Sequence, residues 1–301
     1  MRAADLFAGL GGFTEGAEVA GVRVVWAANH WQAAVDCHEL NHPDVEHQCQ
    51  DLQQADWGTV PRHDLLLASP SCTGHSPAKG RELPRHDAAR STAWAVVSCA
   101  EVHSPSVIAV ENVVRFTKWK LYPAWCAALH AIGYARSPHV LDAADYGVPQ
   151  NRVRLIVIAT RSKHPFMLKP CQAEPQAIGA HIEWDRGPWR TIDRSLAPRT
   201  LHRIANGRRS FGERFVAPYY KSGSGLTGGS IDRPIGTITT RDRWSVIDGN
   251  RMRMLNVNES RAAMGFRASY QLPENPKLAK HMLGNAISPP MVTDIVKQIS
   301  A

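Results

Sequence analysis

The stretch Asp-Leu-Phe-Ala-Gly-Leu-Gly-Gly-Phe, residues 5–13, decides the fold class of this 301-residue chain. An apolar strand beginning at residue 3 runs directly into a glycine turn, and a helical pattern follows at 14–20. Glycines at such a turn let backbone amides approach a ligand closely. Many α/β folds carry a similar turn for packing reasons alone. The turn therefore predicts the fold class, but the identity of the ligand has to be inferred from other residues.

The first half of the chain alternates short apolar segments with helical patterns. Strands are predicted at 3–7, 22–27, 64–68, 107–110 and 154–159, and helices at 14–20, 32–40, 88–103 and 123–132. This alternation is typical of a mostly parallel sheet with helices on both faces. Ligands of such sheets bind at the carboxyl ends of the strands, which is where the conspicuous motifs fall.

The amino-acid composition changes at about residue 164. Proline, glycine, arginine and tryptophan become frequent there, and the helical periodicity of apolar residues fades. Regular patterning returns near residue 254, and 290–299 reads as a closing helix. We therefore expect a first domain at 1–163, completed by 254–301, and a smaller inserted domain at 164–253.

Bulk properties exclude several classes of protein. No apolar run is long enough to span a bilayer, and no signal peptide precedes the first strand, so we expect no membrane partner. The six cysteines are scattered, without a Cys-x-x-Cys pair or a His/Cys cluster. The sequence therefore predicts no metal site and no disulfide framework, and it favours a reducing cytoplasm.

The net charge of +8 is concentrated in one segment. Between Arg186 and Arg253 there are 14 Lys+Arg, 13 of them arginine, against 5 Asp+Glu. The remainder is nearly neutral, with 21 basic and 22 acidic residues. A basic segment on a neutral body indicates a phosphate-backbone partner, and a solvated, loop-rich insertion is the alternative.

Two chemically apt side chains follow two apolar strands. Cys72 comes after the strand at 64–68 and a proline turn, and Glu111 ends the strand at 107–110. A thiolate is a soft nucleophile and a carboxyl group can exchange a proton with a ring nitrogen. Together they predict an enzyme that attacks a ring covalently, although a buried structural cysteine is the other interpretation.

These motifs, in this order, resemble those of the DNA cytosine-5 methyltransferase family. Residues 5–13 are similar to the family's S-adenosylmethionine loop, in which Phe7 would lie against the adenine. Trp31 fits the position that stacks on the adenine, but His30 stands where the family usually has an acid for the ribose hydroxyls. A neutral imidazole accepts only one hydrogen bond, so this position departs from the pattern. Asp51 matches the residue that reads the adenine amino group, or it is a plain strand-end aspartate.

The catalytic motifs are also similar to those of the family. Its usual Pro-Pro-Cys-Gln is Pro70-Ser71-Cys72-Thr73 here. The resemblance implies that the Cys72 thiolate adds to carbon-6 of cytosine while Glu111 faces N3. The run Gln-Asn-Arg-Val-Arg at 150–154 matches the family's Gln-x-Arg-x-Arg motif. We expect Arg152 to lie against the cytosine carbonyl oxygen and Arg154 to position the catalytic loop.

The matches continue in family order to residue 290. Residues 233–240 resemble the motif that ends the recognition region, and 284–290 resemble the last motif, which folds back to the cofactor. The cofactor contacts implied by the resemblance are Phe7, Ala8, Gly9, Gly11, Gly12, His30, Trp31, Asp51, Pro70 and Asn285.

Residues 164–232 correspond to the variable target-recognition region, and 73–90 form a basic loop that either closes over DNA or is a solvated surface loop. The nucleic-acid contacts we expect are Ser76, Lys79, Arg81, Arg208, Arg209, Lys221, Arg233 and Arg241.

The sequence thus predicts a Rossmann-like α/β sheet of the S-adenosylmethionine-dependent methyltransferases with a smaller target-recognition domain. The implied protein is a DNA (cytosine-5)-methyltransferase of the bacterial or phage kind that flips its cytosine out of double-stranded DNA. We expect it in the cytoplasm of a bacterium or phage-infected host. A cognate restriction endonuclease is compatible with this assignment and not required by it.

Three alternatives stay open. One is an RNA cytosine-5 methyltransferase, although the Cys-Phe-Thr signature of that branch is absent from the sequence. Another is a non-catalytic DNA-binding paralogue, although such proteins lose the nucleophile. The third is a related alkyltransferase with an altered donor or product, which the departures at His30 and Ser71 keep in view.

Overall fold

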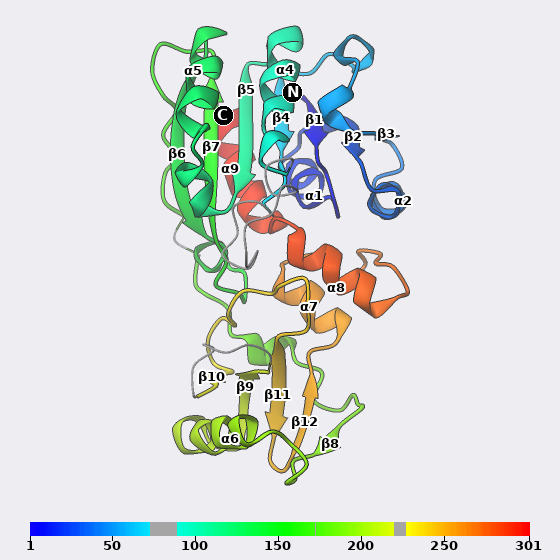
Figure 1. Cartoon of the computed structure of the whole chain (residues 1–301), viewed down its shortest axis with the longest axis vertical. Helices are drawn as coiled ribbons and strands as arrows, with labels where there is room; N and C mark the ends of the chain where they lie inside the picture. Colours follow the sequence, from blue (N-terminus) through cyan, green and yellow to red (C-terminus); the bar gives the residue numbers. More distant parts are fainter. Residues whose placement is uncertain (73–88, 172, 220–226) are drawn as a thin grey trace. The chain divides into compact units, whose positions relative to one another are not determined.

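The computed structural model describes residues 1–72, 89–171, 173–219 and 227–301. The chain forms two compact units, each assembled from separate stretches of sequence (Figure 1). The first unit comprises Met1–Asp142, Val153–Cys171 and Ile287–Ala301, and the second comprises Ala143–Arg152 and Gln172–Ala286.

These boundaries differ from those expected from the sequence. Residues 143–152 and 254–286 belong to the second unit instead of the first. The reason is local packing, because α7 (Val257–Ala263) contacts both α8 (Pro276–Asn285) and the short helix η6 (Ile178–His181). Regular helices return after residue 254, but they pack on the smaller unit.

The first unit is built on a seven-stranded sheet with the order β3-β2-β1-β4-β5-β7-β6. The five strands from β3 to β5 are parallel to one another, and β7 is antiparallel to both β5 and β6. In sheet order the strands are β3 (Glu46–Cys49), β2 (Arg23–Asn29), β1 (Arg2–Leu6), β4 (Leu65–Ala68), β5 (Val107–Asn112), β7 (Val153–Thr160) and β6 (Ala135–Asp142). The predicted α/β class with a large, mostly parallel sheet is confirmed.

The two edge strands, β3 and β6, escaped prediction. The sequence of β3 is Glu-His-Gln-Cys, and β6 carries arginine, proline and histidine. An edge strand has a neighbouring strand on one side only, and its side chains are less covered than those of a central strand. It therefore needs no continuous apolar run. The central strands β4 and β5 are fully buried, and their apolar runs were recognisable for that reason.

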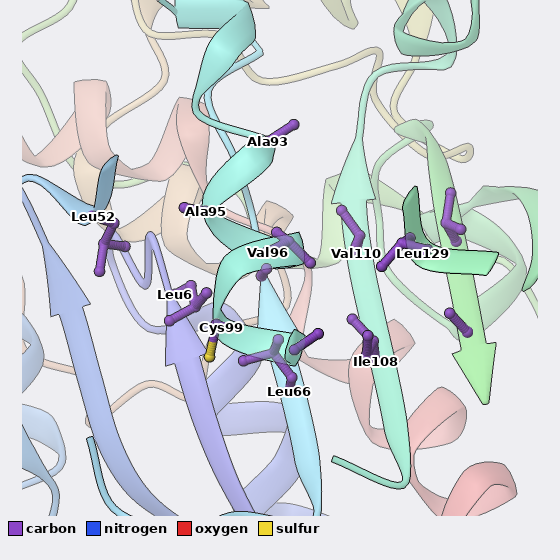
Figure 2. Packing of buried hydrophobic residues seen from close by; sticks show 14 of the residues in the cluster. Leu6, Leu52, Leu66, Ala93, Ala95, Val96, Cys99, Ile108, Val110 and Leu129 are labelled. Atoms are coloured by element: carbon purple, nitrogen blue, oxygen red, sulfur yellow. The ribbon is translucent and has the colours of Figure 1, made fainter. Parts of the chain in front are cut away.

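Helices α4 (Trp94–His103) and α5 (Tyr122–Ala131) cover one face of this sheet. Figure 2 shows Val96 and Cys99 of α4 against Leu6, Leu66 and Ile108 of the central strands. All five side chains are inaccessible to solvent, so each contributes on the order of 1–3 kcal/mol through burial.

The opposite face is covered by α1 (Gly12–Val19) and α9 (Pro289–Ser300), which contact each other extensively. Two glycines of α1 allow this close packing. A Cβ on Gly12 would lie 2.2 Å from the Ile287 carbonyl oxygen, and one on Gly16 would lie 2.5 Å from the Val292 Cβ. Helix α2 (Gln32–Asn41) and the short helices η1 (Leu52–Gln54), η2 (Trp57–Thr59) and η4 (Val114–Lys118) complete the unit.

The second unit contains a five-stranded antiparallel sheet with the order β10-β9-β11-β12-β8. Its strands are β8 (Arg190–Thr191), β9 (Arg214–Pro218), β10 (Gly229–Ser230), β11 (Trp244–Asp248) and β12 (Arg251–Met254), and η5 (Ala143–Tyr146) also belongs to this unit.

Helix α6 (Pro198–Phe211) packs on the second sheet through Ile204, which contacts a cluster that includes Phe215 and Ile247. We predicted no helix here. Most α6 residues are polar, and its buried residues are Arg203, Ile204 and Gly207, so few apolar side chains mark the helix in the sequence. None of the helices in the part of the chain that the structure describes is long and apolar enough to cross a membrane.

Candidate active site

The motif-bearing turns follow neighbouring parallel strands and therefore lie at the same edge of the first sheet. The turn after β1 is tied to β2 by a bond from the Ala8 amide to the Ala28 carbonyl, 3.1 Å. The turn after β4 is tied to β1 by a bond from the Ser69 amide to the Leu6 carbonyl, 3.0 Å. From β1 the chain proceeds outward to β2 and β3, whereas β4 and β5 extend the other way. This is the topological switch point at which such sheets bind ligands.

The glycine turn has an unusual backbone. Phe7, Gly9 and Gly11 have φ angles of 60°, 56° and 88°, which lie in the left-handed region. The left-handed conformation costs a non-glycine residue roughly 1–2 kcal/mol. Contacts with the surrounding residues must therefore offset this cost at Phe7. Phe7, Ala8 and Gly9 are half-buried, and a Cβ on Gly9 would meet no heavy atom closer than 3.7 Å. The backbone at Gly9 is therefore open to a ligand.

The second strand ends in the predicted adenosine positions. His30 is exposed. Half-buried Trp31 directly precedes helix α2 as its N-cap residue, and its amide donates to the Asn29 side-chain oxygen at 3.0 Å. Asp51 is exposed, and its carboxylate accepts a bond from the Gln53 amide at 3.0 Å. Asp51 therefore caps η1, and this structural role leaves its adenine contact a prediction.

The turn that carries Cys72 is held from two sides. The Asn112 side-chain amide donates to the Pro70 carbonyl at 3.0 Å, and the Ser71 amide donates to the Thr92 hydroxyl at 3.1 Å. The Thr92 hydroxyl in turn donates to the Ala89 carbonyl at 2.8 Å. Cys72 itself is half-buried. Neither Asn112 nor Thr92 was expected to hold this turn from the sequence, although Asn112 stands next to Glu111 in the matched motif.

Glu111 forms an ion pair with Arg154. The Arg154 Nε lies 2.9 Å from the Glu111 Oε1, and the two side chains are only 13% and 9% exposed. The antiparallel pairing of β5 with β7 places Glu111 opposite Ile156, two residues along from Arg154 on the same strand face. The arginine of the motif that reaches the acid is therefore the second one.

Arg152 has different surroundings, and its expected contact with the cytosine carbonyl oxygen stays a prediction. Its guanidinium donates to three carbonyls of the second unit: Ile238 at 3.0 Å, Gly284 at 2.9 Å and Ala286 at 2.7 Å. The side chain is buried. The alternation of a β-strand turns residues two apart to one face, but the strand begins only at Val153, so the period does not extend to Arg152.

The described basic candidates differ in exposure. Arg209, Arg233 and Arg241 are exposed, whereas half-buried Arg208 donates to the Gly249 carbonyl at 2.7 Å. Ser76, Lys79, Arg81 and Lys221 lie outside the described residues. Within the described ranges, no group of three or more His, Cys, Asp or Glu side chains is arranged to hold a metal ion.

A buried polar chain beneath the glycine turn was not anticipated. The Thr14 hydroxyl donates to the Asp5 Oδ2 at 2.9 Å and contacts the His38 Nε2 at 3.0 Å, and the His38 Nδ1 lies 2.7 Å from the His47 Nε2. Burial raises the pKa of Asp5 to about 7 and lowers the pKa of His38 well below its usual range. A neutral His38 that donates from Nε2 and accepts at Nδ1 satisfies every contact in this chain.

The sheet and its strand-end thiol and acid define a class of enzyme, and comparison with known proteins agrees. The chain belongs to the C-5 cytosine-specific DNA methylase family, whose sequence pattern matches residues 1–178 and 189–301. It is a cytosine-C5 methyltransferase by family and by its relatives.

Two curated relatives are similar over nearly the whole chain. The type II methyltransferase M.NlaX of Neisseria lactamica is 26% identical, over 99% of this chain and 95% of that protein. The type II methyltransferase M.HhaI of Haemophilus parahaemolyticus is 26% identical, over 95% of this chain and 90% of that protein. Among solved structures, a DNMT2 variant from Spodoptera frugiperda has a TM-score of 0.69 at 17% identity, covering 100% of this chain and 99% of that one. This last likeness concerns the fold.

Methyltransferases of this family generally use S-adenosylmethionine, and most of the matched residues fit that group. The open backbone at Gly9, the left-handed Phe7 and half-buried Trp31 lie at the carboxyl ends of β1 and β2. His30 is the exception, because an imidazole cannot accept from two ribose hydroxyls as a carboxylate can.

Proposed function

We propose that this chain is a DNA (cytosine-5)-methyltransferase that works through a covalent bond between Cys72 and carbon-6 of a flipped cytosine. The observation that carries the proposal is the bond from Asn112 to the Pro70 carbonyl. It joins the turn bearing the nucleophile to the strand end bearing Glu111, so the thiol and the acid belong to one rigid assembly.

Cys72 supplies the nucleophile. Its thiolate adds to carbon-6, and the electron pair of the ring double bond shifts toward N3 and makes carbon-5 electron-rich. Glu111 pairs with Arg154 as a carboxylate; when the base binds, its carboxyl group takes up a proton from solvent and passes it to N3, so negative charge does not accumulate on the ring. Once carbon-5 carries the methyl group, it gives up its proton to solvent water, the carbon-5–carbon-6 double bond re-forms, the Cys72 thiolate leaves, and N3 returns its proton to Glu111.

S-adenosylmethionine supplies the methyl group as an electrophilic sulfonium. The residues that would hold it are those of the glycine turn, Phe7 to Gly12, together with Trp31 and Asn285. Pro70 belongs to the nucleophile turn and would border this site. Its carbonyl accepts the hydrogen bond from the Asn112 side chain, which fixes this turn on the end of β5.

Arg154 is the arginine of the motif that lies beside Glu111. Its Nε is committed to Glu111, which orients the carboxyl group, and the remaining guanidinium edge is the part suited to the cytosine carbonyl oxygen. Arg154 also donates to the Val153 carbonyl through Nη1 at 2.9 Å, which restricts its rotation.

Double-stranded DNA is the proposed substrate. The family description and the type II methyltransferase relatives support it, and so does the local arginine excess, to which exposed Arg209, Arg233 and Arg241 contribute. Because the target atom is stacked inside the duplex, the cytosine must leave the stack to reach Cys72.

A mechanism-based trap tests the function. Duplex DNA carrying 5-fluorocytosine cannot lose its carbon-5 substituent as a proton, so enzyme and DNA should stay linked through denaturing electrophoresis when S-adenosylmethionine is present. Cys72→Ser should form no adduct, because a hydroxyl is scarcely ionised at neutral pH. A stem-loop RNA carrying 5-fluorocytosine forms the second arm. An adduct with RNA alone would transfer the assignment to the RNA-directed branch, and an adduct formed by Cys72→Ser would exclude Cys72 as nucleophile.

A further inference from the structure

We propose that Asp5, Thr14 and His38 are positioning residues for the glycine turn, and that the bond between Thr14 and Asp5 closes this turn. The inference rests on the proposed function, in which the turn holds S-adenosylmethionine. Its structural basis lies wholly within the first unit. The Thr14 hydroxyl donates to the Asp5 Oδ2 at 2.9 Å, and the two residues stand on opposite sides of the turn in the sequence.

The turn needs a constraint from outside because its backbone is strained. Phe7 has a φ of 60°, and Gly9 and Gly11 also lie in the left-handed region. Inside the turn, the Gly11 amide donates to the Ala8 carbonyl at 2.8 Å. Helix α1 follows directly with Gly11 as its N-cap, and glycine has no side chain with which to cap a helix. A bond between the residues that flank the turn supplies the constraint.

Asp5 depends on Thr14 for hydrogen bonds. It is inaccessible to solvent, and its register partners on the neighbouring strands are apolar, Ala27 of β2 and Leu67 of β4. Burial raises the pKa of Asp5 to about 7, and hydrogen bonds from the hydroxyl and the backbone amide of Thr14 act against this rise. Within the described ranges, the Asp5 Oδ1 has no hydrogen-bond partner. Removal of the hydroxyl would therefore leave a buried carboxyl group short of a donor, which is costly.

His38 fixes the direction in which the Thr14 hydroxyl points. Its Nε2 lies 3.0 Å from the hydroxyl oxygen, and its Nδ1 lies 2.7 Å from the His47 Nε2. Burial lowers the pKa of His38 well below its usual range, so the ring is neutral and has a single N–H. With that N–H on Nε2, the Thr14 oxygen accepts from His38, and the hydroxyl proton is directed to Asp5. The chain thus runs from β3 through α2 to the turn.

Another side of α1 is fixed by a separate contact, which provides a matched control. Gly12 and Gly16 contact α9 and the residue two positions before it, whereas Thr14 stands two residues from each glycine and faces a different side of the helix. Thr293 of α9 donates through its hydroxyl to the Gly16 carbonyl at 3.1 Å and to the Pro289 carbonyl at 3.0 Å. Both threonine hydroxyls therefore hold α1, but the bond made by Thr293 does not cross the turn.

Two measurements separate positioning from stability. Calorimetry with S-adenosylhomocysteine, the demethylated product of the donor, gives the Kd without turnover. Amide hydrogen exchange of the unliganded protein reports closure of the turn through the Gly11 amide. We expect Thr14→Val to raise the Kd about tenfold and to accelerate exchange at Gly11 by a similar factor, as the loss of one hydrogen bond implies. Thr14→Ser, which keeps the hydroxyl, should restore both values.

The control Thr293→Val should lower thermal stability and leave both the Kd and the exchange rate at Gly11 unchanged. His38→Leu should weaken binding less than Thr14→Val does, because the Thr14 hydroxyl survives but is no longer directed. It replaces Thr14→Val if that variant does not fold. Its conservative partner is His38→Gln, whose side-chain amide can donate and should recover part of the affinity.

Two results would overturn the inference. If Thr14→Val binds S-adenosylhomocysteine like the parent protein and exchanges at Gly11 at the same rate, the bond does not position the turn. If Thr293→Val weakens binding equally, the effect is a general loosening of α1. If the parent protein does not bind while Thr14→Val still accelerates exchange, the turn is positioned as inferred and the proposed cofactor is refuted, which separates the two failures.

Discussion

Arg154 holds Glu111 through a 2.9 Å contact between Nε and Oε1, with both side chains largely removed from water. Attraction between opposite charges is stronger in such surroundings than at an exposed surface. The pair fixes one carboxylate oxygen of Glu111 and leaves the geometry of the acid well defined before any base arrives. Catalytic groups that are already oriented need no reorganisation in the transition state.

We expect Glu111→Gln to slow formation of the 5-fluorocytosine adduct by about 10²–10⁴-fold, because an amide cannot transfer a proton to N3. S-adenosylhomocysteine affinity should not change, since Glu111 belongs to β5 and not to the glycine turn. Single-turnover gel assays measure the rate. An adduct rate equal to that of the parent protein would show that Glu111 does not serve the ring.

The Thr92 hydroxyl should prove necessary for placing Cys72. Thr92→Val removes the acceptor of the Ser71 amide while preserving shape, and we expect the adduct rate to fall about tenfold, the equivalent of one hydrogen bond worth about 1–1.5 kcal/mol. Thr92→Ser keeps the hydroxyl and should restore most of the rate. If valine and serine behave alike, the hydroxyl does not position the turn.

Replacing His30 with the acid that the family usually has provides a test of the cofactor site. We expect His30→Glu to preserve or tighten S-adenosylmethionine binding, because a carboxylate can accept from both ribose hydroxyls. Calorimetry of the folded protein measures it, with His30→Ala as the control for loss of the imidazole alone. A severe loss of affinity in His30→Glu would give the imidazole a role of its own, including a role with a different donor.

The arginines predicted to bind DNA should separate into two groups. Replacing exposed Arg209, Arg233 or Arg241 by alanine should reduce the slope of log affinity against log salt by about 0.9 for each phosphate that is no longer neutralised. Arg208→Ala should instead destabilise the second unit, because Arg208 donates to the Gly249 carbonyl. Filter binding across a salt series and thermal unfolding distinguish the two effects. An unchanged slope for all three exposed arginines would remove them from the interface.

The sequence was most informative where strands are buried on both faces and motifs follow them directly. The central strands, the glycine turn and the order of the motifs could be predicted because continuous apolar runs and strand-end residues leave a local signal. The placement of Arg152 and Arg154 could not, because the motif shows only their spacing. Which of them reaches Glu111 depends on where β7 begins and on carbonyls more than eighty residues away.

The domain boundary and α6 escaped prediction for a related reason. Whether 254–286 joins the first or the second unit depends on the contacts among α7, α8 and η6, which no local pattern records. The polar chain from Asp5 to His47 is similarly assembled from β1, α1, α2 and β3. A single aspartate within an apolar strand was the only signal available for it.

The buried Asp5 should make stability depend on pH. Its folded-state pKa of about 7 lies above the ordinary value of 3.8, because burial disfavours the charged form. The folded protein therefore binds this proton more tightly than the unfolded chain does. The contribution to the free energy of unfolding is fully present below about pH 4 and is lost as the pH rises to about 7, with a limiting slope of roughly 1.4 kcal/mol per pH unit.

Asp5→Asn removes this titration, so the variant should gain stability relative to the parent protein as the pH is raised from 5 to 7. His38 works in the opposite direction, because its lowered pKa means that stability is lost as the pH falls below its usual value of 6.5. Denaturant unfolding at several pH values measures both effects. If the difference between Asp5→Asn and the parent protein is the same at pH 5 and pH 7, Asp5 does not titrate in this interval, and its partnership with Thr14 is that of an ordinary carboxylate.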